Sequence, residues 1–394
     1  MNFFRNVFAL LMVNLRSIPQ RWSSSLVIVT GLAGVVAVIT ALQSMSAGME
    51  ATLRSTGKPD RAVIIRDGSL TELSSFITRD EFVVLEQNEK LAANAEGKPL
   101  ISGELLVITE QQLKARDTSS NVSMRGVSAR GFDIRPELSL IDGRRFEPGL
   151  QELIVGRKAS EQFANLEVGN EVKLRGSYWT VVGVFESDGD AHESEIWADL
   201  DTAQSAFNRN SFSTALVRLS DPTLFEAFRT EVKDDPRLTQ DVKTEESFYS
   251  AQSGQFRQTI GLLVSVVGVI MGLGAIFAAL NTMYSAVSTR ATEIATLRAL
   301  GFSGGVVVWS TLIEAIILAS AGGLLGGLLA YLLFNGYSVS TLGAGFTQVA
   351  FEFKVSPGLL VGGLVTSLIV GLIGGLFPAI RAARMPIATA LRQD

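Results

Sequence analysis

Cysteine is absent from the chain, and histidine occurs once, as His192. The lack of cysteine excludes disulfide bonds and thiolate metal sites, so each folded part must be held by its core alone. His192 stands among three acidic residues, Asp190, Glu193 and Glu195. Acid-rich solvent loops are far commoner than metal sites with one histidine, and we expect no metal site here.

Motifs for nucleotide hydrolysis are also missing. No G-x-x-x-x-G-K-[ST] phosphate loop occurs, and "GLQELIVGRKAS" (Gly149–Ser160) has the wrong spacing, with no Ser or Thr after its lysine. No Ser/His/Asp order and no pair of carboxylates stands out. The chain is therefore predicted not to be an enzyme and to hold no catalytic residue or cofactor of its own.

Charged residues are scarce, at 19% of the 394 residues, and 47% are apolar. An ordinary soluble domain carries about a quarter charged residues. The charge collects between about residues 50 and 257 and nearly vanishes elsewhere. This distribution predicts one soluble domain within a membrane protein, and the net charge of −5 gives no sign of a nucleic-acid partner.

Four apolar stretches are long enough to cross a bilayer as helices, which takes about 20 residues. They are Ser23–Ser46, Thr259–Thr289, a stretch within Ala299–Phe351 and Val355–Ile380. We interpret the first as a retained helix and not a signal peptide, because 22 residues precede it and it exceeds the usual apolar core of ~7–15 residues.

Arginine and lysine near these stretches predict their orientation. Arg5, Arg16 and Arg21 precede the first, and Arg290 and Arg298 lie between the second and third. The loop between the third and fourth has no Lys or Arg before Lys354. Both termini are therefore expected in the cytoplasm, and the roughly 210-residue domain after the first helix is expected outside.

The outer domain shows mixed α and β patterns. Thr78–Glu89 is predicted to be a helix, because Thr78 and Glu81 have the spacing of a capping box. Glu171–Ser187 has the pattern of a hairpin around Arg175-Gly176-Ser177. The pattern predicts an α+β domain, divided into two lobes near residues 130–150. Gly48–Thr56 and Thr244–Arg257 are helix-compatible and predict stalk helices.

Glycines recur four residues apart in the apolar stretches, a spacing that lets membrane helices approach closely. The expected packing positions are Gly268, Gly272, Gly322, Gly323, Gly326, Gly327, Gly371 and Gly375. Glu314 is an acid within the third stretch, and two interpretations stay open: a residue near the inner interface, or a functional acid inside the membrane.

Residues 290–300 can form a short amphipathic helix that Gly301 ends. Ile294, Leu297 and Leu300 would share one face by i, i+3 spacing. Such a helix on the cytoplasmic side could dock on a soluble partner or lie on lipid.

The segment "TRATEIATLRALGFSGGVVVWSTLIEAIILASAGGLLGGLLAY" (Thr289–Tyr331) resembles the FtsX-like, MacB-type ABC transporter permeases, whose loop reads approximately R-x-x-E-I-x-x-L-R-A-L-G. The matching positions are Arg290, Glu293, Ile294, Leu297, Arg298, Ala299, Leu300, Gly301, Glu314 and the glycines from Gly322 to Gly327. "FPAIRAARMPIATALRQD" (Phe377–Asp394) is similar to the family's ending, and "ELIVGRKASEQF" to its periplasmic core domain.

The resemblance implies an α-helical membrane domain of four transmembrane helices, with an α+β extracytoplasmic domain inserted between helices 1 and 2. The expected segments are a cytoplasmic interfacial helix (1–22), transmembrane helix 1 (23–46), the periplasmic domain with stalk helices (47–257), transmembrane helix 2 (258–289), a coupling helix (290–304), transmembrane helix 3 (305–335), a short periplasmic loop (336–354), transmembrane helix 4 (355–380) and a cytoplasmic tail (381–394).

The resemblance also implies partners. A cytoplasmic ABC ATPase on another polypeptide would bind ATP and Mg and grip residues 290–301, and a second permease copy or paralogue would complete a dimer in the bacterial inner membrane. A periplasmic adaptor and membrane lipids are further expected partners. The tail residues Arg381, Arg384 and Arg392 have two open roles, as ATPase contacts or as inner-face anchors.

The implied function is mechanotransmission: ATP hydrolysis in the partner moves the outer domain, which exports or extracts an amphiphile such as a peptide, antibiotic, lipid or lipoprotein. The alternative is a signalling subunit that controls a periplasmic cell-wall hydrolase and transports nothing.

Overall fold

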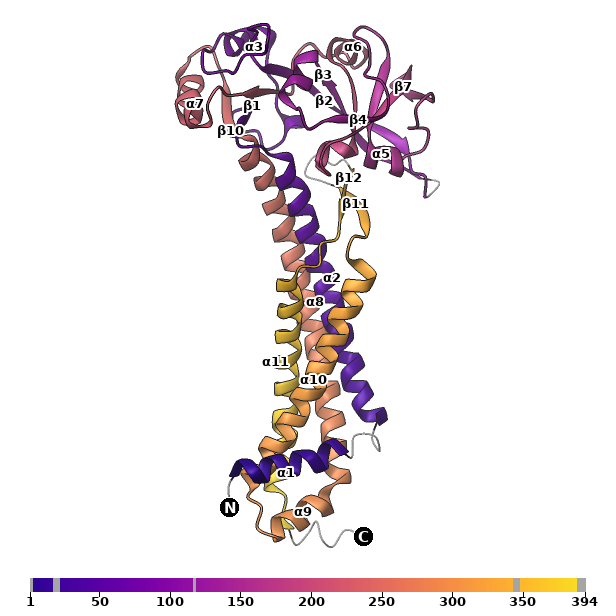
Figure 1. Cartoon of the computed structure of the whole chain (residues 1–394), viewed down its shortest axis with the longest axis vertical. Coiled ribbons are helices and arrows are strands. Elements are labelled where there is room, and N and C mark those ends of the chain that lie inside the picture. The colour runs from indigo at the N-terminus through magenta and orange to yellow at the C-terminus, as the bar shows by residue number, and fades with distance from the viewer. Residues whose placement is uncertain (1–2, 17–21, 116–117, 343–347, 388–394) are drawn as a thin grey trace. The chain divides into compact units, whose positions relative to one another are not determined.

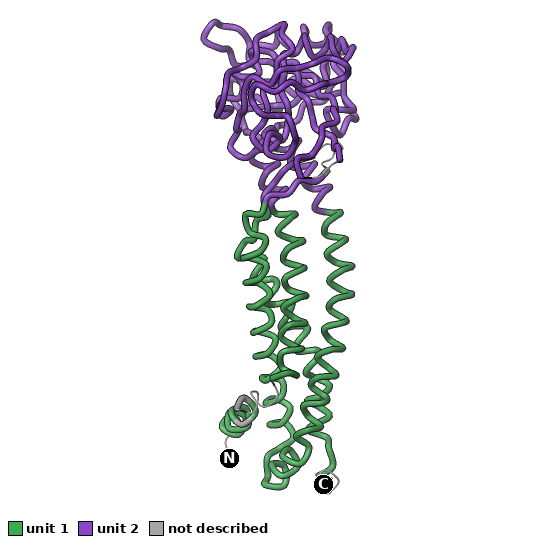
Figure 2. The backbone as a smooth tube through the Cα atoms, turned by 90° about the vertical axis from the view of Figure 1, so that its right-hand side faces the viewer, with its two compact units in different colours: residues 1–47, 258–337, 353–394 green, residues 48–257, 338–352 purple. Residues whose placement is uncertain are grey.

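The computed structural model describes residues 3–16, 22–115, 118–342 and 348–387. These form two compact units, coloured separately in Figure 2. Unit 1 comprises residues 1–47, 258–337 and 353–394, and unit 2 comprises residues 48–257 and 338–352.

Unit 1 is helical (Figure 1). Its helices are α1 (Phe3–Arg16), α2 (Trp22–Thr56), α8 (Glu245–Thr289), α9 (Ala291–Ala299), α10 (Gly304–Phe334) and α11 (Pro357–Arg384), of which α2 and α8 continue into unit 2. Four of them, α2, α8, α10 and α11, are long and apolar enough to cross a membrane. At 1.5 Å per residue even the 28 residues of α11 exceed a hydrocarbon core of about 30 Å. The chain is a multi-pass membrane protein.

Glycines allow α10 to pack tightly against α2 and α11. A β-carbon at Gly322 or Gly326 would lie within 3.0 Å of α2, and one at Gly323 would meet Ser367 of α11. Likewise, β-carbons at Gly371 and Gly375 would lie closer than 3.0 Å to alanines of α10. Five of the eight predicted packing glycines therefore stand where no larger residue fits without a shift.

The other three predicted positions are looser. A β-carbon at Gly327 would lie 3.3 Å from Leu360, and one at Gly268 would lie 3.5 Å from Ile39. At Gly272 nothing described lies within 4 Å. Gly272 therefore packs against no other helix in the described part of the chain.

Unit 2 is built on one ten-stranded sheet. The strands are β1 (Arg61–Arg66), β2 (Ile101–Gln112), β3 (Ser119–Val127), β4 (Ser139–Gly143), β5 (Glu152–Gly156), β6 (Glu171–Leu174), β7 (Ser177–Glu186), β8 (Glu195–Asp199), β9 (Thr214–Arg218) and β10 (Gln240–Thr244). Their order is β10-β1-β9-β2-β3-β8-β5-β7-β4, with β6 paired to β7. The helices beside it are α3 (Arg79–Glu86), α4 (Ala129–Ile134), α5 (Arg157–Gln162), α6 (Leu200–Ala206) and α7 (Phe225–Asp234).

The predicted fold class is confirmed: an α+β domain lies between the first two apolar helices. The predicted division near residues 130–150 is wrong. The long strand β2 joins both halves of the sheet, pairing with β9 over Ile101–Glu104 and with β3 over Leu105–Gln112. β9 and β10 both pair with β1, although more than 140 residues separate them from it in the sequence. The halves of the sheet are therefore not consecutive segments of the chain.

Local predictions within unit 2 are confirmed. Thr78 caps α3, and both bonds of its capping box with Glu81 are present. β6 and β7 form the predicted hairpin, in which Arg175 and Gly176 have φ of 45° and 94°. Positive φ at both residues is typical of a two-residue type I′ turn.

A second hairpin belongs to unit 2 although it lies between α10 and α11 in the sequence. Its strands are β11 (Ser338–Leu342) and β12 (Gln348–Glu352). The Ala350 amide donates to the Ser194 hydroxyl at 2.9 Å, and Phe351 is fully buried. The segment expected as a short loop thus contributes two paired strands to the outer unit.

A buried charge network crosses the middle of the sheet. The Arg125 guanidinium contacts the carboxylates of Glu72 at 2.9 Å and of Glu104 and Glu195 at 2.8 Å. His192 Nδ1 lies 3.2 Å from Glu195. Burial opposes the charged carboxylate, yet Arg125 and His192 hold the pKa of Glu195 well below its usual range. His192 therefore faces an ion pair within the domain.

Candidate functional site: the loop helix and its supports

The helix α9 is closed sharply at its C-terminus. Gly301 has φ of 97°, a conformation that glycine adopts without steric cost. The Phe302 amide donates to the Leu297 carbonyl at 3.2 Å, and the Gly301 amide donates to the Arg298 carbonyl at 3.1 Å. These two bonds form a Schellman motif, so the predicted stop at Gly301 is confirmed.

One face of α9 is buried in unit 1. Ala291, Ile294 and Ala295 are buried, and Ile294 belongs to a cluster with side chains of α1, α8, α10 and α11. Leu297 packs against the same cluster. Leu300, which the sequence placed on this face, is 71% exposed. Six residues of helix turn it about 120° away from Ile294, so the i, i+3 series leaves the buried face.

A buried ion pair anchors the start of α9. Arg290 Nη1 lies 3.3 Å from a carboxylate oxygen of Glu314 in α10, and Nη2 donates to the Asn14 carbonyl of α1 at 3.2 Å. The Asn14 amide in turn donates to the Ser310 hydroxyl of α10 at 2.8 Å. Arg290 is 9% exposed, so its charge is turned toward Glu314 and Asn14 inside unit 1.

The opposite side of α9 faces outward. Glu293 is exposed, and among the described residues no ion pair involves it. Arg298 is half-buried and donates to the Met385 carbonyl, just after α11, at 2.5 Å. Ala299, also a predicted coupling residue, is exposed. Glu293 is therefore the charged group that α9 offers to solvent.

The end of α11 forms a hollow beside α9. Its volume is about 840 Å³, and Tyr284, Ala291, Arg381 and Arg384 are among the residues that line it. The Arg381 guanidinium lies 5.4 Å from the centre of the Tyr284 ring. Both arginines are exposed, and the predicted Arg392 lies outside the described residues.

The family models cover most of the chain. The model of the MacB-like periplasmic core domain matches residues 24–235, and that of the FtsX-like permease C-terminal region matches residues 265–387. The chain belongs to the FtsX-like, MacB-type ABC transporter permeases. This permease thus has its loop helix inside the FtsX-like region.

Individual relatives agree with this assignment. The permease is 25% identical over 304 residues to the macrolide export ATP-binding/permease protein MacB of Neisseria gonorrhoeae, covering 72% of this chain and 45% of the relative. It is 36% identical over 107 residues to the ABC transporter permease YvrN of Bacillus subtilis, covering 27% of this chain and 24% of the relative. The chain spans about half the length of the MacB relatives that it matches.

Among solved structures, the periplasmic region of MacB from Actinobacillus actinomycetemcomitans is similar to 53% of this chain and 95% of its own, with 14% identity and a TM-score of 0.37.

The structure brings part of the predicted set together. Arg290 and Glu314 meet, and Arg298 reaches the segment that follows α11. Sequence reasoning missed Asn14 and Ser310 as supports. The signal for Asn14 was its polarity directly after the apolar run of residues 7–13, which a lipid-facing position would not explain.

Proposed function

We propose that this permease couples ATP hydrolysis by a separate cytoplasmic ABC ATPase to movement of its outer unit in the bacterial inner membrane. The ATPase binds ATP and Mg, two permease subunits form a dimer, and unit 2 lies in the periplasm, where an adaptor protein assists. The cargo is an amphiphile such as a peptide, antibiotic, lipid or lipoprotein. The names of the MacB relatives, which combine export with ATP binding, support this proposal.

The observation that carries the proposal is the way α9 is held. Its buried face packs on four other helices of unit 1, Arg290 is tied to α1 and α10, and Arg298 is tied to the segment after α11. A push on the exposed Glu293 side is therefore transmitted to the membrane helices and not absorbed by a loose loop. An element that only rests on lipid needs no such bracing.

The helix α8 provides a path away from α9. It ends at Thr289, two residues before α9 begins, and its 45 residues extend about 67 Å at 1.5 Å per residue. At its other end Glu245 pairs with Arg61 at 2.9 Å, and it accepts a bond from the Lys58 amide at 2.9 Å. Both contacts lie within unit 2, so this end of α8 is fixed to the outer sheet.

A charge reversal at Glu293 tests the proposal. The ATPase that co-purifies with the chain would be reconstituted with it in liposomes, and hydrolysis measured together with a distance reporter in unit 2. Glu293→Lys should abolish the nucleotide-dependent change in that distance, and Glu293→Gln should give an intermediate loss. Glu89→Lys makes the same charge reversal at an exposed site in unit 2 and should have no effect.

The same preparation separates the outcomes. Full coupling in Glu293→Lys would show that α9 does not dock the ATPase through this residue. Co-purification of a cell-wall hydrolase with the ATPase would favour the signalling function. Absence of any ATPase would leave α9 as a lipid-surface element.

A further inference from the structure

Unit 2 contains an open strand edge that neither the family assignment nor the coupling proposal uses. β2 pairs with β9 only as far as Glu104, whose partner is Thr214, and then with β3 alone from Leu105 to Gln112. One edge of the second half of β2 therefore has no strand beside it among the described residues.

The direction of the backbone groups follows from the bonds at both ends of this edge. The Glu104 carbonyl accepts from the Ser213 amide on the β9 side, and the Leu106 amide donates to the Ser213 hydroxyl at 3.0 Å. The Gln112 carbonyl accepts from the Ala164 amide at 2.8 Å on the same side. Because backbone groups alternate between the two edges of a strand, those of Ile108 and Glu110 point to this side too.

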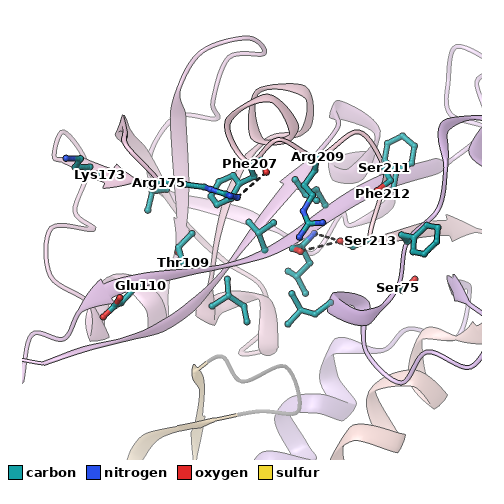
Figure 3. Close-up of a pocket in the computed structure, with 17 residues that line it drawn as sticks. Ser75, Thr109, Glu110, Lys173, Arg175, Phe207, Arg209, Ser211, Phe212 and Ser213 are labelled. Atoms are coloured by element: carbon teal, nitrogen blue, oxygen red, sulfur yellow. Dashed lines mark hydrogen bonds between the residues drawn. The ribbon is translucent and has the colours of Figure 1, made fainter.

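A cavity of about 710 Å³ lies along the edge (Figure 3). Residues 105–110 of β2 line one side, and residues 173–175 of β6 and its turn line another. The loop at 207–213 lines a further part. β6 pairs with β7 alone, so the cavity lies between two strands that each have an open edge.

The lining carries more positive than negative charge. Lys173, Arg175 and Arg209 are exposed cations, whereas Glu110 is the one acidic residue of the lining. Arg175 is held in place by a bond of 3.1 Å to the Phe207 carbonyl. Among the described residues none of the three cations forms an ion pair, so their charges are available to a bound anion.

We propose that this edge of β2 binds an extended acidic peptide segment by strand addition. The peptide backbone would pair with Ile108 and Glu110, as peptides do at open sheet edges elsewhere, and its acidic side chains would meet Arg209, Arg175 and Lys173. The stretch from Leu106 to Gln112 spans about 20 Å, enough for roughly six residues of the peptide. The inference rests on residues of unit 2 alone and is independent of the ATPase.

The test uses the full-length chain in lipid nanodiscs and a fluorescein-labelled octapeptide in which valine and glutamate alternate, followed by fluorescence polarisation. Two further octapeptides carry N-methyl groups on alternate residues, one on the odd and one on the even positions. Strand addition uses the amides of one set only, so one methylated peptide should bind at least about fivefold more weakly than the other.

The charge contribution is tested with variants. Arg209→Glu should weaken binding of the glutamate peptide about tenfold or more, and should bind a lysine-for-glutamate peptide better than the natural chain does. Lys233→Glu, an exposed reversal on α7 outside the cavity, should change binding less than about twofold.

Three results would overturn the proposal. They are no saturable binding of the glutamate peptide, equal loss with both N-methylated peptides, or the same affinity in Arg209→Glu as in Lys233→Glu. Beyond these three, a loss in Arg209→Glu with no gain for the lysine peptide would also overturn it, because reversing a charge that meets the peptide should reverse the preference.

Discussion

Replacing Glu314 with alanine is expected to destabilise unit 1 by about 3–5 kcal/mol. The Arg290 and Glu314 side chains are only 11% and 5% exposed, and their charged atoms lie 3.3 Å apart. Removing the carboxylate leaves the guanidinium buried with the Asn14 carbonyl as a remaining partner. A loss of 3 kcal/mol corresponds to about a hundredfold change in the unfolding equilibrium.

Replacing both residues separates the cost of an orphaned charge from the loss of the contact. Arg290→Met combined with Glu314→Met removes both charges and keeps similar volume. Hydrophobic replacement of a buried pair is often neutral or stabilising, so the double variant should recover most of the lost stability. It should not recover ATPase coupling, because the charged contact between Arg290 and Glu314 is gone and only apolar packing then joins α9 to α10.

The measurement is unfolding of the purified chain in detergent, with the midpoint and slope compared between variants. Glu89→Ala serves as the control, since Glu89 is exposed in unit 2. If Glu314→Ala unfolds like the natural chain, the pair does not hold α9. If the double variant is as unstable as the single one, the loss does not come from an orphaned charge.

Two further predictions concern other parts of the chain. Gly371→Ala would place a methyl group against an alanine of α10 and should lower the free energy of unfolding by about 1–3 kcal/mol. Gly272→Ala places its methyl group in open space and should raise the free energy of unfolding by up to about 1 kcal/mol. Equal effects of the two variants on unfolding in detergent would contradict the packing described. Burial opposes the charged form of His192, but Glu195 and Asp190 raise its pKa above the usual 6.5. Its contribution to stability is therefore complete below about pH 6.5 and is lost as the pH rises through the raised folded pKa. We expect the unfolding temperature of the natural chain to fall as the pH rises above about 6.5, and His192→Gln to remove that fall. An equal fall in the variant would refute this.

The sequence predicted the membrane helices because an apolar run of 20 or more residues has no other stable environment. Three local features were also predictable from the sequence, because each depends on residues close together in the chain. They are the capping box at Thr78, the turn at Arg175 and Gly176, and the helix end at Gly301. The pairing of β2 with both β9 and β3 could not be predicted, because contacts between residues distant in the sequence decide which strands pair.

The loop helix α9 and its supports were predicted only in part, because some of their features depend on neighbouring residues and others on distant ones. The position of Gly301 depends on its neighbours, whereas the burial of Arg290 depends on Glu314 and Asn14, which lie on other helices. The expected face with Leu300 was wrong because i, i+3 spacing drifts around a helix, so Ile294 and Leu297 reach the cluster and Leu300 does not.

The hairpin of β11 and β12 has a consequence for domain exchange between permeases. β1 and β10 are antiparallel neighbours, so the two ends of the inserted outer domain emerge side by side, an arrangement suited to transplantation. Yet residues 338–352 also belong to the outer unit, through Ala350 and the buried Phe351. A chimaera that moves only residues 48–257 would leave the donor domain without its own hairpin, so a graft that keeps specificity must move both segments together.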